Sequence, residues 1–151
     1  QELRGKAKNL TGTKSAMYIK GRLGLVIDGT GKDPRKISKQ AIQLRALGYD
    51  VAMIFVNTDL ETAISRDAKR SRTLGAKGVT DYWKAVQQNI GSFQQMFGKK
   101  NFLVVDNSEG KDYNKETVRA YRDATKFTKA PIANSKAKDW IKKETVKRSK
   151  R

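Results

Sequence analysis

The sequence predicts an α/β fold built on a parallel sheet, because three short apolar runs are separated by helix-length segments. The runs are residues 23–28, 51–56 and 102–105, and continuous apolar runs of this length are typical of strands buried on both faces. Parallel strands need crossover connections, and the intervening segments are long enough to supply them. We therefore expect all three runs in one parallel sheet.

Helices are predicted between and after these runs. Pro34 begins one that ends near Gly48, since Pro is favoured in a first helical turn and Gly at a helix end. Thr58 or Asp59 caps the next. Apolar periodicity predicts further helices over residues 80–97, 115–127 and 136–147, and a short one that ends near residue 20.

Polar residues follow each apolar run. The three run ends read Asp28-Gly29-Thr30, Asn57-Thr58-Asp59 and Asp106-Asn107-Ser108. In open α/β sheets ligands bind beyond the carboxyl ends of the strands. We therefore expect these residues to converge on one ligand-binding edge.

The composition limits the chemistry of this chain. Its 151 residues fit one domain and hold 33 Lys and Arg against 15 Asp and Glu, a formal net charge of +18. The absence of cysteine and histidine excludes disulfides, thiol nucleophiles, imidazole bases and zinc sites. The charge favours an anionic partner, either a nucleotide or phosphorylated ligand or a nucleic acid or other polyanion. No apolar run approaches the ~20 residues that cross a bilayer, so we expect no membrane partner and a cytoplasmic location.

Three regions are expected along the chain. Residues 1–15 form a basic arm, residues 16–130 the α/β core and residues 131–151 a basic helical tail. The last 23 residues hold nine basic and two acidic side chains, which suits an appendage outside the core. The chain begins with Gln1 rather than Met, so we expect further residues upstream.

The strongest local indication of a phosphate-binding or magnesium-binding site is the segment of residues 25–33, at the end of the first apolar run. A carboxylate there, Asp28, can hold Mg²⁺ or its water, the glycines let phosphate approach the backbone, and Thr30 and Lys32 can orient a substrate. The alternative is that Asp28 only caps a turn, since Asp-Gly pairs commonly follow strands.

Basic residues supply two further signals. Arg66 and Arg70, four residues apart, share one helical face and can clamp the oxygens of a transferring phosphoryl group, although a solvated basic face is the alternative. The clustered cations of the tail predict contacts with nucleic-acid phosphates. These are Lys136, Lys138, Lys142, Lys143, Lys147 and Arg148.

The order of the stretches LGLVIDGTGKD, LGYDVAMIFVNT, LETAISRDAKRSR, NIGSFQQMF and FLVVDNS resembles the zeta-toxin-like P-loop kinases, above all small kinase-like proteins of tailed bacteriophages. The resemblance covers roughly residues 16–108. It implies a three-layer P-loop kinase-like parallel sheet in which residues 23–28 and 51–56 flank a first central strand. That strand and its Walker A loop have no counterpart here, because no stretch matches G-x-x-x-x-G-K-[ST]. The sheet is therefore expected to be incomplete.

The resemblance also implies roles for the candidate residues. Asp28 matches an acidic position near Mg²⁺, acting through water, and Thr30 a substrate-side hydroxyl. Arg66 and Arg70 match lid arginines that neutralise charge on the transferred phosphoryl group. ATP or GTP with Mg²⁺ is the implied cofactor of the complete protein, and none is expected to bind tightly to this chain.

Two functions from different classes follow. The first is nucleotide-dependent phosphoryl transfer to a small molecule or nucleotide, inactive in this isolated chain. The alternative is a non-catalytic basic component of a phage virion or DNA-packaging apparatus that binds nucleic acid, virion proteins or another acidic partner, in the host cytoplasm or the virion. The upstream sequence discriminates between them, because an intact Walker A loop there favours the kinase.

Overall fold

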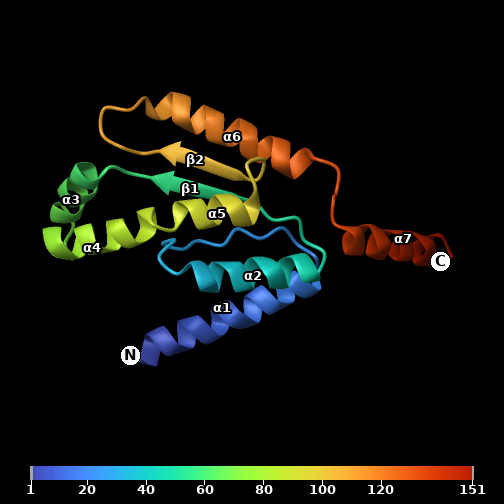
Figure 1. Cartoon of the computed structure of the whole chain (residues 1–151). Helices are drawn as coiled ribbons and strands as arrows, with labels where there is room; N and C mark the ends of the chain where they lie inside the picture. Colours follow the sequence, from blue (N-terminus) through green and yellow to red (C-terminus); the bar gives the residue numbers. More distant parts are fainter. Residues whose placement is uncertain (1, 151) are drawn as a thin grey trace.

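The computed structural model describes residues 2–150, which form seven helices and two strands (Figure 1). The elements in chain order are α1 (Glu2–Lys20), α2 (Pro34–Ala46), β1 (Met53–Asn57), α3 (Leu60–Ala68), α4 (Gly75–Gln87), α5 (Ile90–Phe97), β2 (Phe102–Asp106), α6 (Tyr113–Lys129) and α7 (Ser135–Ser149). None of these helices is both long enough and apolar enough to span a membrane.

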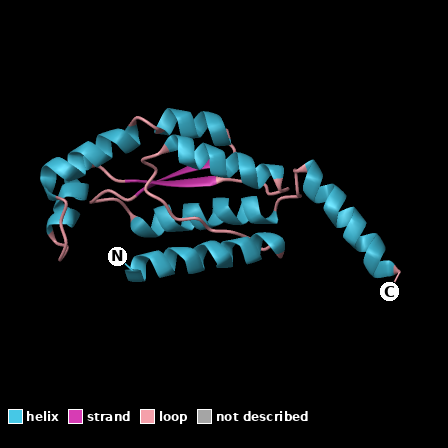
Figure 2. Ribbon diagram, turned by 90° about the horizontal axis from the view of Figure 1, so that it is seen from below, coloured by secondary structure: helices cyan, strands magenta, loops and turns pink. Residues whose placement is uncertain are grey.

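The sheet consists of β1 and β2, which are parallel and in register from the pair Met53 and Phe102 to the pair Asn57 and Asp106. The second and third apolar runs are thus confirmed as parallel strands. Helices α3, α4 and α5 make the connection between them. Helix α6 lies along β2, while α5 and α2 lie on the opposite side of the strands (Figures 1 and 2). The structure is an α/β fold with helices on both sides of a small parallel sheet.

The prediction of a strand over residues 23–28 is wrong. Residues 23–28 pair with no strand of the described chain, and they carry no regular secondary structure. Val26 is fully exposed, and Leu23 and Ile27 are about half exposed. A strand forms only through hydrogen bonds to a neighbouring strand. An apolar run without that neighbour therefore stays irregular and exposed to solvent. The pattern is typical of a strand, but no strand among the described residues pairs with it.

Two helix starts confirm the predicted capping. Asp33 caps α2 by accepting a hydrogen bond from the Lys36 N–H at 3.0 Å, with Pro34 in the first turn. Asp59 caps α3 in the same way. Both side chains satisfy N–H groups that lack helical partners.

The single helix predicted over residues 80–97 is wrong, because the structure divides it into α4 and α5. The break falls at Gln88 and Asn89, before Gly91. The Asn89 amide donates hydrogen bonds to the carbonyls of Gly31 and Lys32, each at 3.0 Å. This contact with a segment distant in sequence holds Asn89 at the start of α5. The predicted short helix near residue 20 is longer than expected and begins at Glu2.

The core is a phenylalanine cluster between β1 and α5. Phe93 is fully buried, and its ring centre lies 6.4 Å from that of Phe55, which in turn lies 6.1 Å from that of Phe102. Phe97 and Ala41 complete the buried cluster and bring α5 and α2 against the sheet. Aromatic rings at these separations bury large apolar areas and favour tilted packing.

The two outer edges of the sheet differ. The outward N–H of Asp106 donates to the Glu116 carboxylate at 3.1 Å, and the outward carbonyl of Val104 accepts from Arg119 at 2.6 Å. Side chains of α6 therefore occupy the β2 edge. On β1 the outward residues are Ile54 and Val56, whose side chains are about half exposed and whose backbone groups pair with no strand of the described chain. Of the two strands among the described residues, β1 alone has an outer edge open for strand pairing.

Truncation of Phe93 tests the core. We expect Phe93→Ala to lower the free energy of unfolding by about 3–5 kcal/mol, because it removes the fully buried ring on which β1 and α5 meet. Urea denaturation followed by circular dichroism measures the loss. Val118→Ala, at a position 65% exposed on α6, is the control and should change stability by less than about 0.5 kcal/mol. Equal effects of the two substitutions would contradict this core.

Candidate functional site

The carboxyl ends of β1 and β2 meet at one edge of the sheet. The ladder continues one step past the strands, where the Asn107 N–H donates to the Asn57 carbonyl at 2.7 Å. The loops that follow the two strands therefore start side by side. This is the edge at which ligands bind in open α/β sheets.

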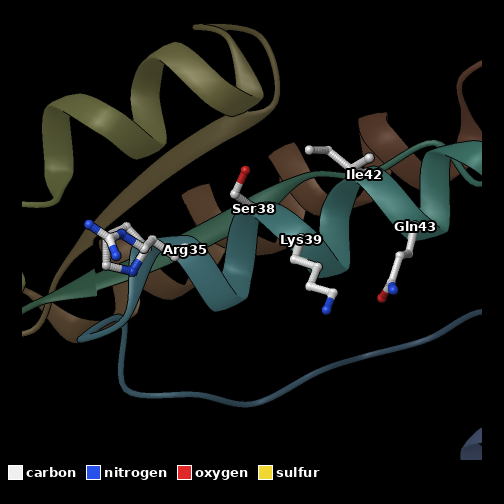
Figure 3. Close-up of a pocket in the computed structure, with 6 residues that line it drawn as sticks. Arg35, Ser38, Lys39, Ile42 and Gln43 are labelled. Carbon is white, nitrogen blue, oxygen red and sulfur yellow. The ribbon is translucent and has the colours of Figure 1, made fainter.

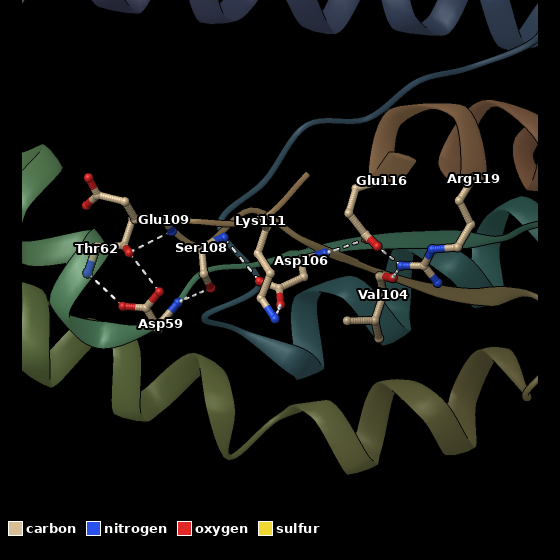
Figure 4. Close-up of polar contacts among 9 residues, drawn as sticks. All are labelled: Asp59, Thr62, Val104, Asp106, Ser108, Glu109, Lys111, Glu116 and Arg119. Carbon is tan, nitrogen blue, oxygen red and sulfur yellow. Dashed lines mark hydrogen bonds and ion pairs between the residues drawn. The ribbon is translucent and has the colours of Figure 1, made fainter. Parts of the chain in front are cut away.

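Asp59 ties the loop after β1 to the loop after β2 (Figure 4). Its carboxylate accepts hydrogen bonds from the N–H and the hydroxyl of Thr62, both at 2.7 Å. Its own N–H donates to the Ser108 hydroxyl at 2.9 Å, and the Thr62 hydroxyl accepts from the Glu109 N–H at 2.9 Å. We call Asp59, Thr62 and Ser108 the strand-end lock. It fixes the first turn of α3 against the β2 loop.

Asp106 is held at the end of β2. Its carboxylate accepts from the Ser108 N–H at 3.0 Å and forms an ion pair with the Lys111 ammonium at 3.2 Å. Asp106 and Asp59 therefore share Ser108 as a common partner. The two carboxylates have separate roles, one at the start of α3 and one in the β2 loop.

Hydrogen bonds keep both carboxylates ionised. The N–H and hydroxyl of Thr62 lower the pKa of Asp59 to about 2, from an ordinary value of 3.8. Hydrogen bonds from Ser108 and the nearby Lys111 ammonium lower the pKa of Asp106. Each donor stabilises the charged form, so both residues are anionic at neutral pH.

Two further contacts position the basic end of α3. The Arg66 guanidinium donates to the Tyr113 hydroxyl at the start of α6. The buried Asp67 carboxylate accepts from the Leu74 and Gly75 N–H groups at 2.9 and 3.1 Å and so holds the start of α4. The turn between α3 and α4, residues 69–74, is exposed. It carries Arg70, which lies beyond the end of α3, so the prediction that Arg66 and Arg70 share one helical face is wrong.

The predicted Asp28 segment lies in the irregular connection before α2. Asp28 and Thr30 are exposed and have no hydrogen bond or ion pair with any described residue. Gly31, with φ of +71°, is buried, and a Cβ there would lie 3.7 Å from Phe55 and Phe93. The Lys32 ammonium lies 3.7 Å from the centre of the Tyr82 ring. Gly31 thus anchors the segment on the core, while Asp28 and Thr30 are exposed on its surface.

The structure brings together only part of the predicted site. The polar ends of β1 and β2 converge as expected, whereas no described contact joins Asp28 to Arg66 or Arg70. Sequence reasoning missed the lock between Asp59, Thr62 and Ser108. The capping of α3 by Asp59 was the only signal of it. The Ser108 contact spans 49 residues and leaves no local pattern.

Two pockets of the structure lie away from the strand ends, one on α2 and one where α2 meets α7. An open groove of about 590 Å³ runs along the outer face of α2 (Figure 3), lined by Pro34, Arg35, Ser38, Lys39, Ile42 and Gln43. One helix supplies all of these residues, so the groove lacks polar groups converging from separate elements. Among residues 2–150, no group of three or more acidic, His or Cys side chains is placed to hold a metal ion. We therefore assign the candidate site to the strand ends and not to this groove.

Comparison with known proteins identifies a family. A family model described as Zeta toxin matches residues 4–126, from α1 into the last turns of α6. Searches of curated proteins and of solved structures gave no match. Helix α7 lies beyond the matched residues.

Acid titration tests the strand-end lock. Because the pKa of Asp59 is lower in the folded chain than its ordinary 3.8, the native state binds this proton less tightly than the unfolded state. The stabilisation is complete above about pH 4 and is lost as the pH falls towards 2. We expect Asp59→Asn to remove part of this acid dependence.

Urea denaturation at several pH values between 2 and 5 measures this effect. Asp28→Asn is the matched control, with the same charge change at an exposed residue that has no described hydrogen-bond partner. It should retain the steep acid loss of the unsubstituted chain. Parallel pH profiles for both variants would show that Asp59 does not stabilise the fold as a carboxylate.

Proposed function

Because this chain belongs to the zeta toxin family, we propose that it is a P-loop kinase-like phosphotransferase domain. The complete protein transfers a phosphoryl group from ATP or GTP, with Mg²⁺, to a small molecule or nucleotide. The observation that carries this proposal is the family match, which extends over 4–126. The parallel sheet with a polar carboxyl edge supports it, because that edge suits a phosphorylated ligand.

The candidate residues take the following roles. Asp28 acts near Mg²⁺ through its water shell, and Thr30 and Lys32 face the substrate. Arg66 and Arg70 neutralise charge on the transferred group. Arg70 is exposed and Arg66 is partly exposed, and their basic character supports these assignments, since guanidiniums bind phosphate oxygens in bidentate fashion.

The strand-end lock serves this function by positioning α3. Asp59 and Thr62 fix the first turn of the helix that carries Arg66, and the Tyr113 hydroxyl holds the Arg66 guanidinium. A guanidinium held in place loses less conformational entropy when it meets a phosphate. Arg66 is therefore the better ordered of the two proposed arginines.

The fit of a magnesium nucleotide to these residues is partial. Asp28 offers a free carboxylate, and Arg66 and Arg70 offer donors for phosphate oxygens. No stretch of the sequence offers the Gly-rich ring of N–H groups with a lysine that holds β- and γ-phosphates in line. The residues thus fit the periphery of the nucleotide and not its reacting phosphates, and we derive no catalytic step from them.

We expect residues 1–151 to show no measurable kinase or ATPase turnover. Positioning supplies much of the rate of phosphoryl transfer, and these residues do not supply it for the reacting phosphates. A coupled ADP-release assay and transfer of ³²P from labelled ATP measure the activity. Robust phosphorylation by this chain would show that the site is misplaced.

If an upstream Walker A segment exists, a longer form that includes it tests the arginines. We expect Arg66→Ala and Arg70→Ala to lower turnover by about 10³-fold with little change in nucleotide affinity, because their charge acts on the transition state. Arg72→Ala, in the same exposed turn, is the control and should keep full activity. Full activity in all three variants would show that the arginines only form a solvated face.

A further inference from the structure

Helices α1 and α7 contain no buried residue. Helix α6 contains none either, but it contacts β2 through Glu116 and Arg119. A helix in a folded domain normally packs an apolar stripe on the core, and most helical stability comes from that packing. Both helices are instead strongly basic. Helix α1 holds five Lys and Arg against one Glu, and α7 holds six against two acidic residues. We call α1 and α7 the basic arms.

The two arms start from a common junction at the end of α2. Arg22, just after α1, donates to the Leu47 carbonyl, and its guanidinium lies 5.6 Å from the centre of the Trp140 ring of α7. Arg22 has a φ of +56°, a left-handed conformation that ends α1 and directs the chain away from the helix axis. One side chain at the end of α1 therefore contacts both the end of α2 and Trp140 of α7.

Helix α7 is docked by its first turn. The Asn134 amide donates to the Arg45 carbonyl at 2.8 Å, and the Lys136 ammonium donates to the Ala46 carbonyl at 3.0 Å. Gly48 has a φ of +106°, and the backbone of Ala137 lies close to it. A Cβ atom at position 48 would be 3.2 Å from the Ala137 nitrogen. Lys136 and Asn134 thus satisfy carbonyls at the carboxyl end of α2, where cations and donors are favoured. The start of α7 has a fixed place on the domain.

Most cations of the arms have no partner among the described residues. Lys136 is used in docking, and Lys147 pairs with Glu144 at 2.8 Å. The remaining predicted tail cations have no hydrogen bond or ion pair with the described residues, namely Lys138, Lys142, Lys143 and Arg148. The same holds in α1 for Arg4, Lys8, Lys14 and Lys20. Their charge is available to a ligand.

These cations are spread along two rods and not gathered in a pocket. The arms extend in opposite directions from the junction, with the chain ends far apart (Figures 1 and 2). At about 1.5 Å per residue, the arms are ~28 and ~22 Å long. A small anion can contact only a few of these cations at once. A nucleic-acid duplex, with one charge per ~1.7 Å of its axis, can contact many.

We propose that the basic arms bind the phosphate backbone of duplex nucleic acid without reading its sequence. Arg22 lies over one face of the Trp140 ring, which leaves that face unavailable for stacking on a base. An anionic membrane fits less well, because the apolar residues Trp140, Ile141 and Val146 fall on three different sides of α7 and form no continuous face. This inference goes beyond the proposed phosphotransferase function, and α7 lies outside the residues that match the family.

Salt dependence measures the contribution of the arms. Fluorescence anisotropy of a labelled 24-base-pair DNA duplex would be recorded with the full chain from 50 to 300 mM NaCl. We expect the substitution of Lys138, Lys142, Lys143 and Arg148 by Gln to reduce the slope of log K against log salt by about 3.6, because each phosphate that a cation neutralises adds about 0.9 to the slope. A weak slope in the unsubstituted chain would overturn the proposal.

The matched control removes the same charge elsewhere. Lys84, Lys99, Lys100 and Lys129 are exposed cations outside the arms, and their substitution by Gln gives the same net charge as the arm variant. The control should retain most of the slope. Equal reductions of the slope in the two variants would show that binding follows net charge alone. Tighter binding to phosphatidylserine vesicles than to the duplex, abolished in the arm variant, would assign the arms to membranes instead.

The junction has its own test. Trp140→Ala leaves every charge in place but removes the ring that Arg22 packs against. We expect it to weaken duplex binding severalfold with the salt slope unchanged, since the cations remain but are no longer held in a fixed arrangement. Far-UV circular dichroism checks that the variant keeps its helices. Unchanged affinity in a folded variant would show that the junction does not organise the arms.

Discussion

The packing of Phe93 against Phe55 is the contact on which the remaining architecture depends. A two-stranded sheet is marginally stable alone, so β1 and β2 need an apolar partner. Helix α5 supplies it with Phe93 and Phe97, and α2 adds Ala41 from the same side. The same cluster holds Gly31, because a side chain at this position would meet the Phe55 and Phe93 rings. One small aromatic core thus positions the sheet, α2 and the loop that carries Asp28.

A chain of polar contacts extends this order from the sheet to α3. Because β1 and β2 are in register, Asp59 and Ser108 follow the strand ends at matching heights, and the two residues bond. Asp59 then fixes the start of α3, and Asp67 near its end fixes the start of α4. The placement of Arg66 therefore derives from the strand register. Disruption of the strand-end lock would make Arg66 less ordered, although Arg66 itself is unchanged.

Local patterns predicted the elements that depend on local chemistry. Pro34 and the Asp59 cap correctly gave two helix starts, and continuous apolar runs gave both strands of the sheet. The failures depend on partners distant in sequence. Residues 23–28 have a strand pattern but no neighbour among the described residues, and the break before α5 follows from Asn89 binding carbonyls 57 and 58 residues away. The strand ends could be predicted to converge because parallel strands end at the same edge of a sheet. The bond between Asp59 and Ser108 could not be predicted, because it joins residues 49 positions apart.

The unequal edges of the sheet set a limit on self-association. Glu116 and Arg119 occupy the outward backbone groups of β2, so a second copy can add a strand only at Ile54 and Val56 of β1. Each copy then has one open edge, the outer edge of β1. When two copies pair through these edges, neither copy has an open edge left. An assembly formed in this way closes at two subunits and cannot propagate into a fibril. The ion pair between Glu116 and Arg119 on α6 thus blocks the addition of further strands at β2.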